Sequence, residues 1–184
     1  MQSRRRVVLF QDESAPALWS DFNIRHSASA DAYGIINMDS LKLIAFDKDD
    51  LEIISAHLQD AIVNAGEIIW RPSERRVVIP LCRFDWVGAE GETPEYRRRL
   101  AALRFERVSA FKARNVNPSD KAAVLNLLSV DFAEADAPTG HVTLNFSGDV
   151  AIRLDVECLE SELADLGPEW TTAHRPGHPE NLDG

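Results

Sequence analysis

The sequence predicts an α+β fold: about six mostly antiparallel strands forming a curved sheet or half-barrel, with one helix before the strands and one after them. Three patterns predict this order. A stripe of apolar residues with a helical period comes first, segments that alternate apolar and polar residues follow, and a second helical stripe comes last. The sequence has no G-x-G-x-x-G motif, no P-loop and no βαβ alternation, which argues against a doubly wound nucleotide-binding fold.

The first helix is predicted over residues 47–66, DKDDLEIISAHLQDAIVNAG. Asp47 suits the N-cap, and the acidic residues after it suit the positive end of the helix dipole. Gly66 suits the C′ position that ends a helix. The apolar stripe consists of Leu51, Ile54, Leu58, Ala61 and Ile62, and it must pack against another element.

A hairpin is predicted next, because EIIW and RRVVIPLCRFDW flank the turn RPSE. Pro80 has no N–H to donate, so the second strand is expected to be an edge or bulged at that point. Strand alternation places Cys82, Phe84 and Trp86 on one face and Arg83 and Asp85 on the other. We interpret Arg83 and Asp85 as a solvated or rim ion pair worth less than about 1 kcal/mol.

Three further patterns complete the predicted sheet and its second helix. RRRLAALRFERVSAFKARNV changes phase near Glu106 and Arg107, which predicts a bulge or a bend. LLSVDFAE reads as a strand, and HVTLNFSGDVAIRLDV reads as a hairpin with one apolar and one polar face. CLESELADLG then shows a helical stripe of Leu159, Leu163 and Leu166 before the stop signal Gly167-Pro168.

The chain of 184 residues is about one domain long. Residues 1–37 show no sustained period, and Met38 stands just before the first ordered-looking segment, so we expect a flexible N-terminal extension there. The single α+β domain is predicted over residues 38–172. Residues 173–184 are expected to be a flexible tail, because PGHPENLDG carries turn formers without an apolar anchor.

The net charge of −10 argues against a general nucleic-acid binder, because affinity for polyphosphate depends on Lys and Arg. The charge is unevenly distributed: residues 71–114 hold eleven basic and six acidic residues, whereas residues 149–169 hold seven acidic residues and Arg153. Two widely spaced cysteines indicate free thiols in a reducing compartment. The apolar run after SRRR is four residues long, too short for a signal peptide, and no stretch is long enough to span a membrane. These features predict a cytoplasmic protein.

The segments SAHLQDA, RFDW, LRFERV, DKAAVLNLL and IRLDVECLESELADLGP resemble a known family. They are similar to the small, mostly alphaproteobacterial proteins grouped as the domain-of-unknown-function 2948 family. The resemblance covers roughly residues 41–173, and the segments occur in order. It implies no activity, cofactor or catalytic residue.

The main binding candidate is the arginine run after Tyr96, together with Trp86. Arg97, Arg98 and Arg99 beside aromatic rings are typical of surfaces that hold phosphate, nucleic acid or an acidic partner. Alternation puts Arg97 and Arg99 on one face and Arg98 on the other, so only part of the run converges. The competing interpretation is a solubilising loop-to-strand junction that partly neutralises the predicted acidic helix of the same chain.

The sequence therefore favours a small interaction module without chemistry of its own, which binds an acidic protein partner. The alternative is binding of a small anionic ligand or an RNA segment at the same place. An enzyme that uses His57 or Cys82 is the weaker alternative, because no local pattern supplies either residue with a partner. No cofactor and no metal site are predicted.

Overall fold

The computed structural model describes residues 40–90, 95–116, 123–173 and 175–176. The predicted extension over residues 1–37 lies outside them. The described residues form ten strands, a short 3-10 turn η1 (Ala65–Glu67) and a single α-helix, α2 (Lys48–Leu58). The strands are β1 (Lys42–Ala45), β2 (Ile62–Asn64), β3 (Ile69–Arg71), β4 (Arg76–Phe84), β5 (Arg97–Phe105), β6 (Val108–Arg114), β7 (Val124–Glu134), β8 (Gly140–Phe146), β9 (Val150–Val156) and β10 (Ser161–Thr171).

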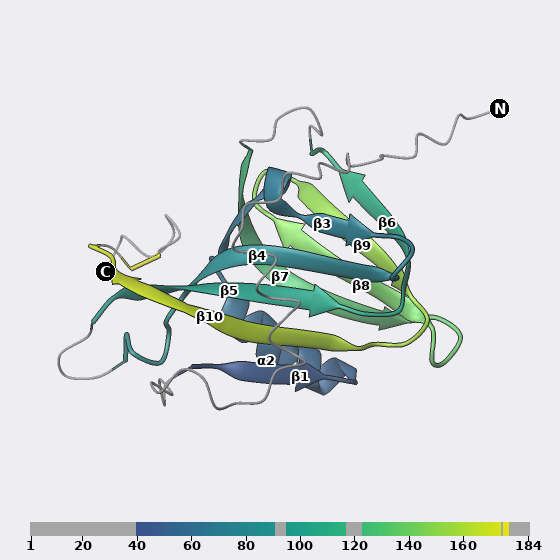
Figure 1. Ribbon diagram of the computed structural model, residues 1–184, viewed down its shortest axis with the longest axis horizontal. Helices are drawn as coiled ribbons and strands as arrows, with labels where there is room; N and C mark the ends of the chain where they lie inside the picture. Colours follow the sequence, from purple (N-terminus) through teal and green to yellow (C-terminus); the bar gives the residue numbers. More distant parts are fainter. Residues whose placement is uncertain (1–39, 91–94, 117–122, 174, 177–184) are drawn as a thin grey trace. The chain divides into compact units, whose positions relative to one another are not determined.

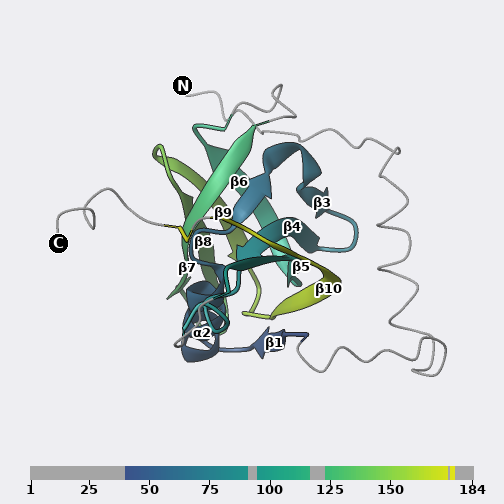
Figure 2. The ribbon, with the colours of Figure 1, turned by 90° about the vertical axis from the view of Figure 1, so that its left-hand side faces the viewer.

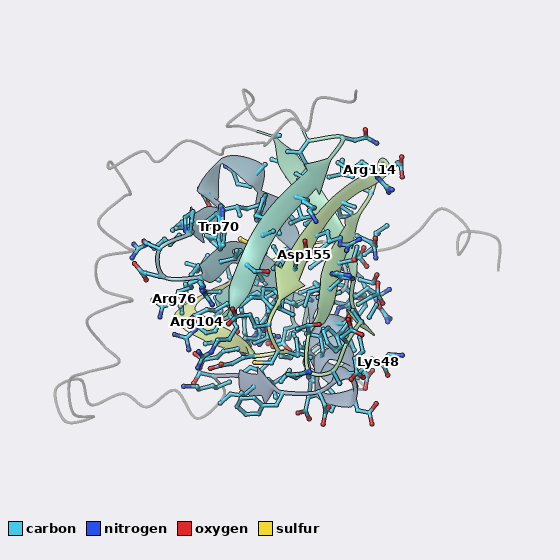
Figure 3. The ribbon with its side chains drawn as sticks, turned by 90° about the vertical axis from the view of Figure 1, so that its right-hand side faces the viewer. Lys48, Trp70, Arg76, Arg104, Arg114 and Asp155 are labelled. Carbon is cyan, nitrogen blue, oxygen red and sulfur yellow. The ribbon has the colours of Figure 1, made fainter. Side chains whose placement is uncertain are left out.

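The prediction of about six strands and two helices is therefore wrong. All strands pair antiparallel in the order β1-β10-β5-β4-β2-β7-β8-β9-β6, and β3 pairs with β4 beside this path. The sheet is open but strongly curved, so that β6 comes to lie beside β3 (Figures 1 and 2). Trp70 of β3, labelled in Figure 3, stacks on Phe111 of β6 with 6.4 Å between the ring centroids.

Helix α2 begins as predicted but ends eight residues before Gly66. Asp47 is the N-cap, and its side chain accepts a hydrogen bond from the backbone N–H of Asp50 at 2.9 Å. After Leu58 the chain turns at Asp60, which has a φ of 59°. The segment that follows, with the β-branched Ile62 and Val63, forms β2 between β4 and β7.

The predicted second helix over CLESELADLG is the strand β10, which pairs with β1 and β5. Leu159 and Leu163 are buried, as the helical stripe predicted, but both are also buried when this segment is extended. The two neighbouring strands supply the backbone hydrogen bonds that a helix would have made internally. A pattern of three leucines cannot distinguish the two geometries.

Pro80 occupies a position where no ladder hydrogen bond is needed. On one side it pairs with Ala102 of β5. On the other side, β3 pairs with β4 as far as Val78, and β2 pairs with it from Leu81 onward. Pro80 therefore lies in the gap between two short strands, which agrees with its predicted position at a local edge.

The phase change near Glu106 and Arg107 is a corner between two strands. β5 ends at Phe105, Arg107 has a φ of 58°, and β6 begins at Val108. β5 pairs with β4 and β10, whereas β6 pairs with β9, so the corner passes the chain from one half of the sheet to the other. A bend was predicted at this point, and here the chain also changes all of its neighbouring strands.

The apolar core lies on the concave side of the sheet, where helix α2 contacts β1, β4 and β7. Leu51, Ile54 and Leu58 of the helix are buried against it. The hydroxyl of Ser55 accepts a hydrogen bond from the N–H of Val130 at 2.8 Å, next to the bulge of β7. In the described part of the chain, no helix is long and apolar enough to cross a membrane.

Candidate functional site

The basic and acidic segments of the sequence neutralise each other in the fold. β5 lies beside β10 and β6 lies beside β9, which brings residues 71–114 against residues 149–169. The resulting ion pairs are Arg75–Glu157, Arg83–Asp165, Arg97–Glu169, Arg99–Glu169, Arg104–Glu162, Arg107–Glu160, Lys112–Asp155 and Arg114–Asp149. The basic and acidic segments of the sequence thus largely pair with each other within the protein. Two of the three arginines considered as binding residues, Arg97 and Arg99, already have a carboxylate partner.

The most deeply buried of these pairs lies on the concave face, at one end of the core. Arg83 donates from Nε and Nη2 to the two carboxylate oxygens of Asp165, each at 2.8 Å. The side chains are 4% and 3% exposed. Asp165 also accepts a hydrogen bond from the backbone N–H of Leu41 at 3.0 Å. The interpretation of Arg83 as a solvated rim residue paired with Asp85 is therefore wrong.

Asp85, Arg99 and Glu169 continue this group toward the end of the sheet. The Nε of Arg99 donates to Asp85 at 3.1 Å, and its Nη2 lies 2.9 Å from Glu169. Burial would raise the pKa of Asp85, but hydrogen bonds from the Gly88 N–H and from Arg99 lower it, and the net shift is downward. We call Arg83, Asp85, Arg99, Asp165 and Glu169 the charged cluster.

His57, on helix α2, faces the charged cluster. Burial lowers its pKa, and the positive charge of Arg83 lowers it further, against the opposing effect of Asp85 and Asp165. The imidazole is therefore held in its neutral form more strongly than a free histidine. The cluster contains three carboxylates and two guanidiniums, and Arg97, which pairs with Glu169 from outside the cluster, supplies the third positive charge.

The convex face carries a different set of side chains at the same end of the sheet. Phe84, Arg98 and Trp170 occupy paired positions on β4, β5 and β10, so their side chains share one face. The ring of Trp86 packs edge-on against Phe84 at 4.7 Å, and the ring of Tyr96 lies 6.1 Å from Phe84. Together with Arg175 we call these residues the aromatic–arginine surface.

Two cations of this surface are stacked on aromatic rings. The guanidinium of Arg98 lies 5.9 Å from the centre of the Phe84 ring, and that of Arg175 lies 5.4 Å from the centre of the Trp86 ring. Nη1 of Arg98 donates to the carbonyls of Asp60 and Cys82, each at 3.2 Å. Among the residues that the structure describes, neither guanidinium forms an ion pair with a carboxylate, in contrast to Arg97 and Arg99.

Trp86 and Arg98 also fix the chain where helix α2 ends. The indole N–H of Trp86 donates to the carbonyl of Gln59 at 3.2 Å, one residue before the carbonyl that Arg98 holds. Part of each side chain therefore has a structural role. Both side chains are half-buried, and Trp170, which pairs with Arg98 across the sheet, is 42% exposed.

The two residues considered for catalysis lie on opposite faces of the sheet. Cys82 interacts electrostatically with Arg98 on the convex side, whereas His57 faces Arg83 and Asp165 on the concave side. Burial raises the pKa of Cys82, which disfavours the thiolate that a nucleophile requires. The arrangement gives no support to an enzyme that uses these two residues together.

Sequence reasoning missed four residues of this region: Asp165, Glu169, Trp170 and Arg175. The first three fell in or just after the segment assigned to a helix, which hid their alignment with β5. Arg175 fell in the predicted tail. Once the segment is extended, the alternation of Leu163, Asp165 and the residues after them would have indicated the two faces.

The described residues contain no group of three or more histidine, cysteine, aspartate or glutamate side chains placed to hold a metal ion. A family described as "Protein of unknown function (DUF2948)" matches residues 41–178 of the chain. Neither a curated protein nor a solved structure gives a significant match.

Proposed function

Because the chain belongs to the DUF2948 family, whose description gives no activity, we propose a function from the geometry: an interaction module that binds an acidic segment of a partner protein on the aromatic–arginine surface. The observation that carries this proposal is the pair of ring-stacked guanidiniums, Arg98 and Arg175. Among the described residues neither forms an ion pair, although the charge of Asp60 acts on Arg98, whereas Arg83 and Arg99 on the concave side are ion-paired.

The chemistry of the surface supports this proposal. Tryptophan, tyrosine and arginine are enriched at the energetic centres of protein interfaces, because they bury a large area and retain directional hydrogen bonds. A guanidinium stacked on a ring keeps N–H donors at its edge that can bind a carboxylate. The two hydrogen bonds that Arg98 forms with described residues both come from Nη1, so Nε and Nη2 remain as donors for a ligand.

We restrict the proposed site to the convex face. Arg97 and Arg99 each contact Glu169 on the concave side, so we propose that Arg98 binds the partner with Trp86 and Tyr96, joined by Trp170 and Arg175. The overall charge of −10 opposes binding of an acidic partner at long range. We therefore expect short-range contacts, in which salt reduces the affinity and the aromatic rings supply most of the buried area.

The test uses a photo-activated cross-linking residue at two matched positions of the full chain. Val87 adjoins Trp86, Val124 is on β7, and both are 70% exposed. We expect a partner from native extract to cross-link at position 87 and not at 124, with loss of the product in Arg175→Glu. Arg114→Glu, which makes the same change of charge at an exposed residue of β6, is the control.

Equal cross-linking at both positions, or a product insensitive to Arg175→Glu, would contradict the proposal. Recovery of RNA or of a small anionic molecule in place of a protein would favour the alternative ligand at the same surface. Rising salt should weaken the product in either case, because exposed charge contacts are screened.

A further inference from the structure

A pocket of about 430 Å³ lies at the opposite end of β10 from the aromatic–arginine surface. It is formed by the start of helix α2, the end of β7 and the connection from β9 to β10. Its apolar lining includes Phe46, Phe132 and Leu159. The volume falls within the range of pockets that hold small molecules.

The apolar residues Leu159 and Phe132 of the pocket are fixed by packing against the core. Leu159 is 5% exposed and belongs to the core, and Phe132 packs against the core from β7. The Phe132 ring lies so close over Gly140 that a Cβ on that residue would be 2.5 Å from the ring. Phe46, in contrast, is 66% exposed at the pocket, where a ligand could cover it.

The charges at the pocket favour a cation. Asp49 and Glu134 line it, and among the described residues neither forms an ion pair. Lys48, which also lines the pocket, is directed to Glu52 at 3.7 Å and lies at the surface of the helix (Figure 3). Two carboxylates beside two phenyl rings attract an ammonium or guanidinium group by charge and by cation–π contact.

The start of helix α2 would by itself favour an anion, but it carries the acidic N-cap Asp47 and the acidic residues Asp49 and Asp50 in its first turn. The N–H of Asp50 is bonded to the Asp47 side chain, and the N–H of Phe46 is bonded to the Asp50 side chain at 3.3 Å. These two carboxylates compensate the positive end of the helix. Asp49 and Glu134 are therefore the charges left to act on a ligand.

From the pocket volume, the fixed apolar lining and the two unpaired carboxylates, we infer that the pocket binds a small organic cation: an ammonium or guanidinium group carried on an apolar body. Its apolar body lies on Phe132 and Leu159, and its charged group reaches Asp49 and Glu134. This site is independent of the surface proposed above, because the two lie at opposite ends of β10.

The test compares two probes of similar shape and opposite charge, 4-phenylbutylammonium and 4-phenylbutyrate, against the full chain labelled with ¹⁵N. We expect saturable shifts of the amide signals of Phe46, Lys48 and Glu134 with the amine and none with the carboxylate. Asp49→Asn and Glu134→Gln should each raise the Kd of the amine by about 2- to 5-fold, the range of an exposed charge contact. Glu90→Gln, an exposed carboxylate in the turn after β4, should leave it unchanged.

Three results would overturn the inference. The first is equal binding of the two probes, and the second is the absence of any saturable shift. The third is a short peptide, acetyl-Ala-Lys-Phe-amide, binding more tightly than the amine, because the ligand would then be a protein side chain. Thermal unfolding of each variant shows whether it is folded, so that a loss of binding is not mistaken for a loss of structure.

Discussion

At the scale of single residues, the Arg83–Asp165 pair is the most consequential contact of the charged cluster. Both side chains are almost fully buried, and they form two parallel hydrogen bonds. Removal of one partner leaves the other charge buried without compensation. We expect Asp165→Asn to lower the free energy of unfolding in urea by about 3–5 kcal/mol.

An exposed ion pair provides the control for this measurement. Lys48 and Glu52 are 64% and 65% exposed, so Glu52→Gln should change the free energy of unfolding by less than about 1 kcal/mol. If the two variants were equally stable, the buried pair would not stabilise the fold. The double variant Arg83→Met/Asp165→Leu should recover part of the loss, because an apolar pair leaves no buried charge.

His57 predicts how the stability depends on pH. Its pKa is lowered by burial and by Arg83, so in the range below about pH 6.5 the unfolded chain binds a proton that the folded protein does not. Stability should therefore fall as the pH drops through this range. The lowered pKa values of Asp85 and Asp155 act near pH 4 and below, which is a separate window.

The corresponding variant is His57→Gln, followed by urea unfolding at several values between pH 5.5 and 7.5. We expect the slope of stability against pH to be smaller in the variant than in the wild-type protein. At pH 8 the imidazole is neutral in both the folded and the unfolded protein. A difference in stability at that pH therefore reports the lost packing of His57, and only the change with pH reports its titration. An unchanged slope would show that another group is responsible.

At the scale of elements, the sequence predicted strands better than it predicted helices. The hairpins β3–β4 and β8–β9 follow from alternation and turn residues, which are local signals. Helix α2 was extended too far, and β10 was assigned to a helix, because leucine spacing fits both geometries in a short segment. What decides both cases is non-local: β2 fills the space between β4 and β7, and β10 fills the space between β1 and β5.

The candidate site shows the same limit. Trp86, Tyr96 and the arginine run could be selected from composition, and alternation separated Arg98 from its neighbours. Which of the arginines are already neutralised depends on the register of β5 against β10, which pairs Arg99 with Glu169 and Arg98 with Trp170. That register is fixed by packing between segments far apart in the chain, so no local sequence pattern predicts it.

The β7–β8 hairpin depends on a glycine that the sequence pattern did not identify. A Cβ at position 140 would meet the Phe132 ring at 2.5 Å and the Ala133 carbonyl oxygen at 2.8 Å. We expect Gly140→Ala to lower the free energy of unfolding by about 1–3 kcal/mol, the range for overpacking. Phe132→Leu should relieve part of this loss when the two changes are combined.

Gly148→Ala serves as the matched control. A Cβ at that position meets nothing within 4 Å, so its effect of about 1 kcal/mol comes from the φ of 74° alone. Combination of Gly148→Ala with Phe132→Leu should therefore be additive. Additivity in the Gly140 pair as well would show that the ring contact does not determine the cost.

At the scale of the molecule, β2 joins two halves of the sheet. β1, β10, β5 and β4 lie on one side of it, and β7, β8, β9 and β6 lie on the other. The strand is three residues long, yet Val63 is fully buried, and the chain next to it exchanges backbone hydrogen bonds with Leu127 at 2.8 and 2.9 Å. The corner between β5 and β6 and the short connection from β9 to β10 also join the halves.

Because the halves share one core and one bridging strand, we expect them to unfold together. In native-state hydrogen exchange, the amides of Leu103 in β5 and Leu144 in β8 should then report the same free energy of opening. Val63→Ala should lower both values equally, by about 2 kcal/mol, since the cavity lies in the shared bridge. A decrease at Leu144 without one at Leu103, or the reverse, would show that the curved sheet consists of two units that unfold separately.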